Sequence, residues 1–201
     1  MVILLLDVGA NTGYYTLLAA SLSKSGKIYS VEAKPKVYQR LLNNIQINGF
    51  TNVFAFNVAE WNTNLVTPMD EKEGLFANGT IDSEKDASLL ADGTVKVEMR
   101  VDDILGPPVS LIKMDIEGAE PLALQGMKNI LNQSVIPALI IEFNPGYNTK
   151  MLIQQLPKNS YIGLIDDNEG VTQIGIPKFF NLRNSINLLV LPDNTKVGKE
   201  R

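Results

Sequence analysis

A carboxylate, two glycines and an asparagine interrupt the chain at the point where an apolar run gives way to a helix-like segment. The stretch "DVGANTGYYT" at residues 7–16 follows "VILLL" and contains Asp7, Gly9, Asn11 and Gly13. Glycines between a buried strand and a helix let the backbone approach a ligand closely and let the helix pack against the strand. The stretch therefore predicts a crevice for a nucleotide-like cofactor.

The spacing of the glycines narrows the choice of cofactor. The dinucleotide fingerprint is G-x-G-x-x-G, whereas here Gly9, Ala10, Asn11, Thr12 and Gly13 follow Asp7, whose charge would repel a pyrophosphate. An ammonium and a sulfonium would instead be attracted. Glu32 ends the next apolar run, 25 residues after Asp7, where a carboxylate can accept both hydroxyls of an adenosine ribose. We predict S-adenosylmethionine; the alternative is that Asp7 or Asn11 caps a helix and Glu32 is a solvated strand end.

A second group of charges interrupts the buried run "LIKMDIEGAEP" at residues 111–121. Along an extended chain Lys113 and Asp115 share one face, and Glu117 and Glu120 follow around the turn. Crowded carboxylates raise each other's pKa, and a carboxylate so tuned can take a proton. The alternative is that these acids only favour a helix N-terminus and that Lys113 pairs with Asp115.

The run "IIEFNPG" delivers Glu142 and Asn144 to the same predicted edge. These two side chains are candidates for contact with a substrate, or they order a loop. Glu120 and Glu142, with Asp115 and Glu117, are also oxygen ligands of the kind that magnesium accepts, although nothing in their spacing requires a metal.

Composition excludes several classes of protein. The 201 residues include no cysteine and no histidine, so acid–base chemistry depends on Asp, Glu, Lys or Tyr. A net charge of -4 argues against nucleic-acid binding. The opening "MVILLL" is too short for a membrane span, so we expect a soluble, cytoplasmic protein without membrane insertion.

Short apolar runs alternate with helical periodicity, which predicts an α/β fold with a mostly parallel sheet covered by helices on both faces. The expected strands are "VILLL", "KIYSV", "VFAFNV", "LIKM", "ALIIEF" and "INLLVL", and the expected helices cover residues 14–24, 36–48 and 119–132. Residues 60–94 are polar and predict an irregular excursion, followed by a half-exposed strand in "VKVEMRVDD". We expect one domain over residues 1–201.

The order and spacing of five segments resemble the FkbM family of S-adenosylmethionine-dependent methyltransferases. These segments are "DVGANTGYYT", "VEAKP", "VDDIL", "LIKMDIEGAE" and "IIEFNP". The resemblance covers roughly residues 3–145. It implies a Rossmann-like methyltransferase fold in which "INLLVL" is an antiparallel strand near the C-terminal end and "SYIGLI" is its hairpin partner. It also leads us to expect a helix before the first strand that the given sequence does not contain.

The resemblance assigns a role to each cofactor residue. Asp7, Gly9, Asn11 and Gly13, with Ala10 and Thr12 between them, would cradle the methionine part, and Glu32 with Ala33 would hold the ribose. Asn57, Val58 and Ala59 would lie by the adenine. Similar proteins are O-methyltransferases of hydroxyls on sugars, polyketides or other small metabolites, which makes a small-molecule hydroxyl acceptor the expected partner.

Methyl transfer to a hydroxyl requires alignment of the acceptor and removal of its proton. With histidine absent, Asp115 is the leading candidate for the base or for a substrate anchor, assisted by Lys113 and Glu117. Two other functions compete with this hypothesis. One is an NAD-dependent oxidoreductase or epimerase, which the glycine spacing disfavours, and the other is a non-catalytic module that binds an adenosine cofactor.

Overall fold

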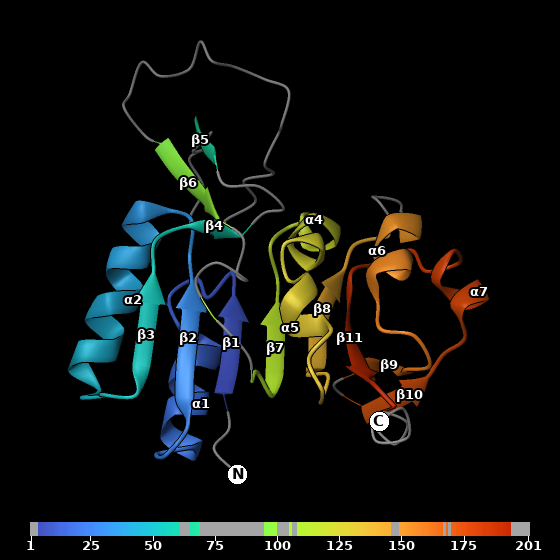
Figure 1. The fold of residues 1–201 in the computed structure, drawn as a ribbon, viewed down its shortest axis with the longest axis horizontal. Coiled ribbons are helices and arrows are strands. Elements are labelled where there is room, and N and C mark those ends of the chain that lie inside the picture. The colour runs from blue at the N-terminus through green and yellow to red at the C-terminus, as the bar shows by residue number, and fades with distance from the viewer. Residues whose placement is uncertain are drawn as a thin grey trace.

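The computed structural model describes residues 4–60, 65–68, 95–99, 105, 108–145, 149–166, 168 and 170–193. Its centre is an eight-stranded sheet in the order β10-β9-β11-β8-β7-β1-β2-β3 (Figure 1). Five neighbouring strands are parallel: β3 (Val53–Phe56), β2 (Lys27–Val31), β1 (Leu4–Val8), β7 (Leu111–Met114) and β8 (Ala138–Phe143). The predicted parallel sheet is confirmed.

The C-terminal part of the sheet is antiparallel. Strand β11 (Ile186–Leu191) lies between β8 and β9 (Tyr161–Asp166) and runs antiparallel to both. The prediction that "INLLVL" is an antiparallel strand paired with "SYIGLI" is therefore confirmed. Strand β10 (Gly170–Gln173) adds an edge that the sequence did not indicate, because all four of its residues are exposed and give no apolar alternation.

Helices cover both faces of the sheet, because successive strand residues point to opposite sides. Leu5 packs with Ala20 of α1 (Tyr14–Leu22). Leu6, its neighbour, belongs to the larger core that contains Leu124 of α4 (Glu120–Gln125) and Ile130 of α5 (Lys128–Leu131). Three further helices complete the layers: α2 (Pro35–Ile47), α6 (Thr149–Gln155) and α7 (Ile176–Phe179).

Several helix and strand boundaries in the structure differ from those predicted from sequence. The helix expected over residues 119–132 is two short helices, because the chain closes α4 with a C-cap at Gly126 before α5 begins. Helix α1 ends at Leu22 and not at residue 24, and β3 ends at Phe56 and not at residue 58. Strand β1 continues through Asp7 to Val8, so the carboxylate expected to end the strand lies within it.

A second, three-stranded sheet has the order β4-β6-β5, with β4 at Ala59–Glu60, β5 at Leu65–Pro68 and β6 at Val95–Met99. Strand β6 is antiparallel to β5 and parallel to β4. Residues 61–64 and 69–94 of the predicted excursion, and the two faces predicted for "VKVEMRVDD", lie outside the described residues. Among the helices that the structure describes, none has the length and apolar character needed to cross a membrane.

Candidate functional site

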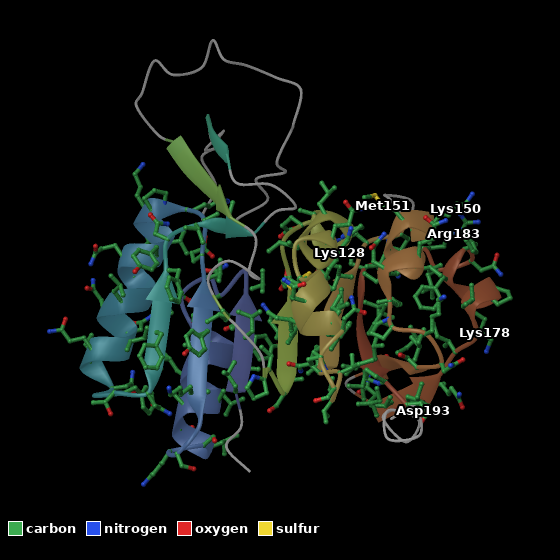
Figure 2. The ribbon with its side chains drawn as sticks, viewed as in Figure 1. Lys128, Lys150, Met151, Lys178, Arg183 and Asp193 are labelled. Atoms are coloured by element: carbon green, nitrogen blue, oxygen red, sulfur yellow. The ribbon has the colours of Figure 1, made fainter. Side chains whose placement is uncertain are left out.

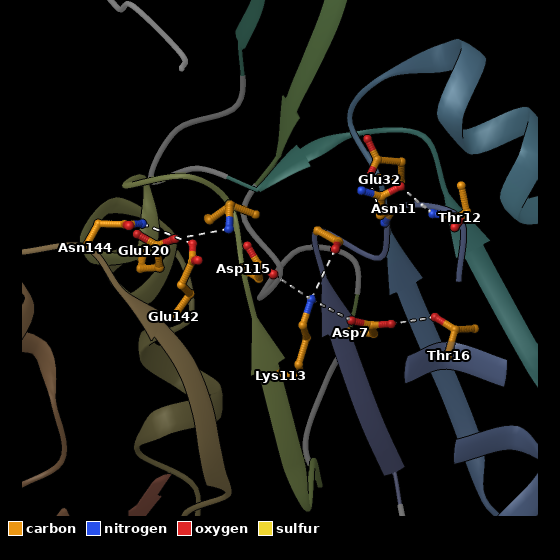
Figure 3. Close-up of polar contacts among 12 residues, drawn as sticks. Asp7, Asn11, Thr12, Thr16, Glu32, Lys113, Asp115, Glu120, Glu142 and Asn144 are labelled. Atoms are coloured by element: carbon orange, nitrogen blue, oxygen red, sulfur yellow. Dashed lines mark hydrogen bonds and ion pairs between the residues drawn. The ribbon is translucent and has the colours of Figure 1, made fainter. Parts of the chain in front are cut away.

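The candidate site lies where β1, β2, β7 and β8 end, because the carboxyl ends of parallel strands share one edge of the sheet (Figure 3). Register across the sheet sets the polar side chains side by side. Asp7 of β1 is paired with Ser30 of β2 on one side and with Lys113 of β7 on the other. The register of β7 with β8 pairs Met114 with Ile141. One more step along both strands brings Asp115 level with Glu142.

The glycine turn is held by backbone hydrogen bonds and by tight packing. The amides of Gly9 and Ala10 both donate to the carbonyl of Val31, each at 2.9 Å. Gly9 has a φ of 74°, and a Cβ there would lie 1.9 Å from the carbonyl oxygen of Asp115. Gly13 has a φ of 101°, and a Cβ there would lie 2.7 Å from the Leu41 side chain of α2. Both glycines thus allow close packing of the chain on itself, with Gly13 packing on helix α2 where we had expected a strand.

Glu32 closes the other side of the turn. Its Oε2 accepts the amide of Asn11 at 2.9 Å, and its Oε1 accepts the amide of Lys34 at 2.8 Å. Burial raises the pKa of Glu32 above its ordinary value, and the hydrogen bonds from Lys34 and Asn11 oppose this shift. A carboxylate has about four acceptor positions. With one bond to each oxygen, Glu32 retains capacity for two further donors, which fits a ribose diol.

Amide side chains hold the rest of the turn in place through hydrogen bonds to its backbone. Asn11 has the left-handed φ of 52°, and its Oδ1 accepts the amide of Thr12 at 2.8 Å. Asn44 of α2 donates to the carbonyl of Thr12 at 2.8 Å. Asn57, predicted to lie by the adenine, donates to the carbonyls of Glu32 and Ala33 at 2.8 and 3.1 Å. The Asn57 amide therefore fixes the segment that carries Glu32.

Val58 and Ala59 follow Asn57 at the end of β3. Val58 is partly buried and packs against the main core, and Ala59 is buried at the start of β4. Their backbone continues along the same edge of the sheet as Glu32. A contact of these two residues with an adenine ring stays a prediction.

Asp7 has no exposed surface. The hydroxyl of Thr16 donates to its Oδ2 at 2.6 Å and lies 2.8 Å from the Ser30 hydroxyl. Lys113 Nζ lies 3.6 Å from Oδ1, which has no hydrogen-bond partner among the described residues. Burial raises the pKa of Asp7, although the positive charge of Lys113 and the Thr16 hydrogen bond lower it. The prediction that Asp7 contacts the methionine part of the cofactor stays a prediction, and the contacts seen are with the protein.

Lys113 connects the cofactor turn with the acid cluster. Its Nζ lies 3.6 Å from Asp7, 3.7 Å from the Asp115 carboxylate and 3.3 Å from the Gly9 carbonyl, to which it donates a hydrogen bond. The same ammonium lies 5.1 Å from the centre of the Tyr15 ring. The pairing of Lys113 with Asp115 that we considered from sequence is confirmed, and the same lysine also neutralises Asp7.

The acid cluster consists of Asp115, Glu117 and Glu142. The pKa of Glu142 is raised to about 7, first by burial and second by the negative charge of Asp115, with a side-chain hydrogen bond to Asp115 contributing. Burial and the charge of Asp115 also raise the pKa of Glu117, and Lys34 opposes this shift. Glu117 has a left-handed φ of 56°, an uncommon conformation for a residue with a side chain. The structure thus brings together three of the acids predicted to share this edge.

Glu120 has a different environment. It is buried, and its Oε1 accepts the amides of Ile116 and Gly118 at 3.0 and 3.2 Å. Glu120 thus holds the turn that presents Asp115 and Glu117. Among the described residues, no group of three or more acids is arranged to hold a metal ion.

Asn144 extends the cluster toward the C-terminal part of the sheet. Its amide donates to Glu142 Oε2 at 3.0 Å, and the Ser185 hydroxyl donates to its Oδ1. Thr16, Ser30, Tyr15 and Ser185 were not predicted as site residues. Tyr15 and Thr16 lie on α1 just after the glycine turn, Ser30 lies within β2, and Ser185 precedes β11; the packing of α1 and the register of the strands bring their side chains to the site.

Solved structures share this arrangement of strands and helices. A precorrin-6y C5,15-methyltransferase from Geobacter metallireducens GS-15 has a TM-score of 0.54 and 11% sequence identity, over 94% of this chain and 79% of that chain. A putative rRNA methylase from Clostridium thermocellum has a TM-score of 0.57 and 10% identity, over 94% and 86%. A putative methyltransferase from Streptococcus mutans, in complex with SAH, has a TM-score of 0.52 and 12% identity, over 94% and 88%. The fold is therefore the Rossmann-like methyltransferase fold.

The methyltransferase FkbM domain matches residues 7–162, more than half of the chain. The protein therefore belongs to the FkbM methyltransferase family, as its motifs had suggested. It is an S-adenosylmethionine-dependent methyltransferase, and S-adenosylmethionine is its cofactor. The free acceptor capacity of Glu32 fits a ligand that carries a ribose diol. No curated protein matches the chain by sequence.

Proposed function

We propose that the protein transfers the methyl group to a hydroxyl oxygen of a small-molecule acceptor, and that Glu142, paired with Asp115, takes the hydroxyl proton. The observation that carries the proposal is the position of Glu142 level with Asp115 at the ends of β8 and β7, together with the pKa of Glu142 raised to about 7. A base whose pKa lies near the working pH combines a useful charged fraction with enough basicity to accept a proton.

The environment of the pair favours Glu142 over Asp115 as the proton acceptor. The Lys113 ammonium lies 3.7 Å from the Asp115 carboxylate and stabilises a negative charge there. The raised pKa of Glu142 makes its charged form a stronger base than an ordinary glutamate carboxylate. Asp115, the leading candidate from sequence, then tunes Glu142 and orients the acceptor.

The chain's own residues also support the cofactor side of the reaction. When bound, S-adenosylmethionine supplies a methyl group on a positively charged sulfur. Glu32, Asn11 and the glycine turn are the residues proposed to hold it, with Glu32 accepting hydroxyl hydrogen bonds through its free lone pairs. The acceptor oxygen would bond to the methyl carbon, the bond from that carbon to sulfur would break with S-adenosylhomocysteine as the leaving group, and the hydroxyl proton would pass to the charged form of Glu142.

Amine and thiol acceptors make a different demand. A neutral amine already carries a free lone pair, and a thiol ionises more readily than an alcohol. Both therefore depend less than an alcohol does on a base in contact with the acceptor. A carboxyl pair with a raised pKa is therefore most useful for an alcohol. This reasoning selects oxygen as the methylated atom.

The test is an acceptor screen with purified protein and S-adenosylmethionine, measuring release of S-adenosylhomocysteine by mass spectrometry. The panel pairs hydroxylated sugars and polyketide-like alcohols with matched amines and thiols. We expect turnover with hydroxyl acceptors, and a loss of about 10²- to 10⁴-fold in Glu142→Gln with cofactor affinity unchanged. Transfer confined to nitrogen or sulfur, or full turnover in Glu142→Gln, would refute the proposal.

A further inference from the structure

A surface hollow of about 480 Å³ lies between α6 and α7. Its lining includes Thr149 and Lys150 of α6, Phe179 of α7, and Phe180 and Arg183, which follow α7. Phe179 is buried, whereas Phe180 is 59% exposed. The hollow thus combines apolar ring surface with two cationic side chains.

The charge of the hollow contrasts with that of the chain. The whole sequence has a net charge of -4. No carboxylate is among the described residues that line the hollow, and neither Lys150 nor Arg183 has an ion pair with a described residue. Figure 2 shows both side chains near one another at the end of the molecule that α6 and α7 form. Two positive charges therefore face the same space without an acidic partner there.

Chain neighbours and one hydrogen bond link the hollow with the acid cluster. Pro145, which lines the hollow, directly follows Asn144, the residue that donates to Glu142. Ser185, two residues after Arg183, donates to Asn144. The ring of Phe143, which follows Glu142 in β8 and points to the opposite face of the sheet, packs edge-on against Phe179 with centres 5.4 Å apart. The hollow thus adjoins the Glu142 end of the site.

We propose that this hollow binds an anionic group, a phosphoryl or a carboxylate, carried by the methyl acceptor. That the anionic ligand is the methyl acceptor rests on the proposed function, whereas binding of an anion in the hollow does not. A guanidinium presents paired donors that match the oxygens of either group, and an ammonium adds a second, less directional charge. The exposed face of Phe180 supplies apolar contact for the body of the ligand. A hydroxyl on the same molecule then reaches toward Glu142.

The test is calorimetric titration of the protein, without S-adenosylmethionine, using glucose 6-phosphate, glucuronate and glucose as probes. We expect the wild type to bind at least one anionic probe about tenfold or more tightly than glucose. Affinity falls as salt increases, because the charges are exposed. Glucose 6-phosphate and glucuronate distinguish a phosphoryl group from a carboxylate, and binding of either supports the proposal.

The variants Arg183→Gln and Lys150→Gln each should weaken binding of that probe by about tenfold. Lys178→Gln is the matched control, because it removes an exposed positive charge on α7 that does not line the hollow (Figure 2). Equal affinity for glucose and both anions, no effect of Arg183→Gln and Lys150→Gln, or an equal loss in Lys178→Gln overturns the proposal. A protein that binds the anion here but methylates no hydroxyl would refute the proposed function alone.

Discussion

The pH dependence of methyl transfer tests the role of Glu142 most directly. Only the charged form of a carboxyl group can accept a proton, and the pKa of Glu142 is about 7. The charged fraction then rises from about 9% at pH 6 to about 91% at pH 8. We therefore expect kcat/KM to increase about tenfold between these two pH values when proton removal limits the rate.

The assay measures initial rates of S-adenosylhomocysteine release from pH 5.5 to 8.5 at constant ionic strength, with the best hydroxyl acceptor. Glu142→Gln should flatten the profile. Asp115→Asn should move its midpoint to lower pH, because it removes the second largest cause of the raised pKa while burial remains. If Asp115 is itself the base, Asp115→Asn instead abolishes the rate without moving a midpoint.

The titration can also be measured without any acceptor. In protein carrying ¹³C-labelled glutamate, one side-chain resonance should titrate near pH 7 and be absent from Glu142→Gln. The same raised pKa implies that the folded state binds more protons than the unfolded state between about pH 4.5 and 7, so Glu142 reduces stability as pH rises through that range. A Glu142 resonance that titrates near 4.5 would refute the reasoning.

Three other perturbations test the frame that holds the site. Gly9→Ala should lower the free energy of unfolding by about 2–5 kcal/mol in urea denaturation, because a Cβ would lie 1.9 Å from a backbone oxygen at a φ of 74°. Gly49→Ala is its control, since φ there is 67° with no atom within 4 Å, and a similar loss in both would exclude the steric cause. Lys113→Met should lower the free energy of unfolding by about 3–5 kcal/mol, because it leaves Asp7 buried without its cation. Adding Asp7→Asn to the same chain should restore part of that loss. A loss below about 1 kcal/mol in Lys113→Met would refute this ion pair as a structural support. Glu32→Gln should weaken S-adenosylmethionine binding by about 10- to 100-fold in calorimetry, while the control Gly49→Ala leaves the affinity unchanged. An unchanged affinity in Glu32→Gln would exclude Glu32 from the pocket.

The parallel strands could be predicted from sequence because they are short and rich in branched apolar residues, and β1 and β7 are buried along most of their length. Apolar periodicity also located α1 and α2 to within a few residues. Periodicity could not separate α4 from α5, because Gly126 lies in an otherwise continuous helical pattern and the break depends on how the two helices pack on the sheet. Strand β10 has no buried face, so no alternation of apolar and polar residues predicted it.

The site was predicted in part, and the limit is the register between strands. The sequence indicated that Asp7, Lys113 and Glu142 end up at one edge, because each belongs to a predicted parallel strand. It could not show that Asp7 and Lys113 are direct neighbours, since they are 106 residues apart and only the pairing of β1 with β7 aligns them. The contact of Ser185 with Asn144, 41 residues away, was missed for the same reason, whereas Thr16 is only nine residues from Asp7 and its contact depends on how α1 packs.

Register also explains the charge environment of Glu142. Strand β7 lies between β1 and β8, so Lys113 faces Asp7 on one side and reaches Asp115 at its own strand end. Its single positive charge is shared by these two carboxylates. Glu142, one strand further from β1, has burial, Asp115 and Glu117 raising its pKa and only the Asn144 hydrogen bond opposing them. Strand order and burial therefore give two similar carboxyl groups different surroundings, and Glu142, which has no ion pair with a described residue, is the group we propose to accept a proton near neutral pH.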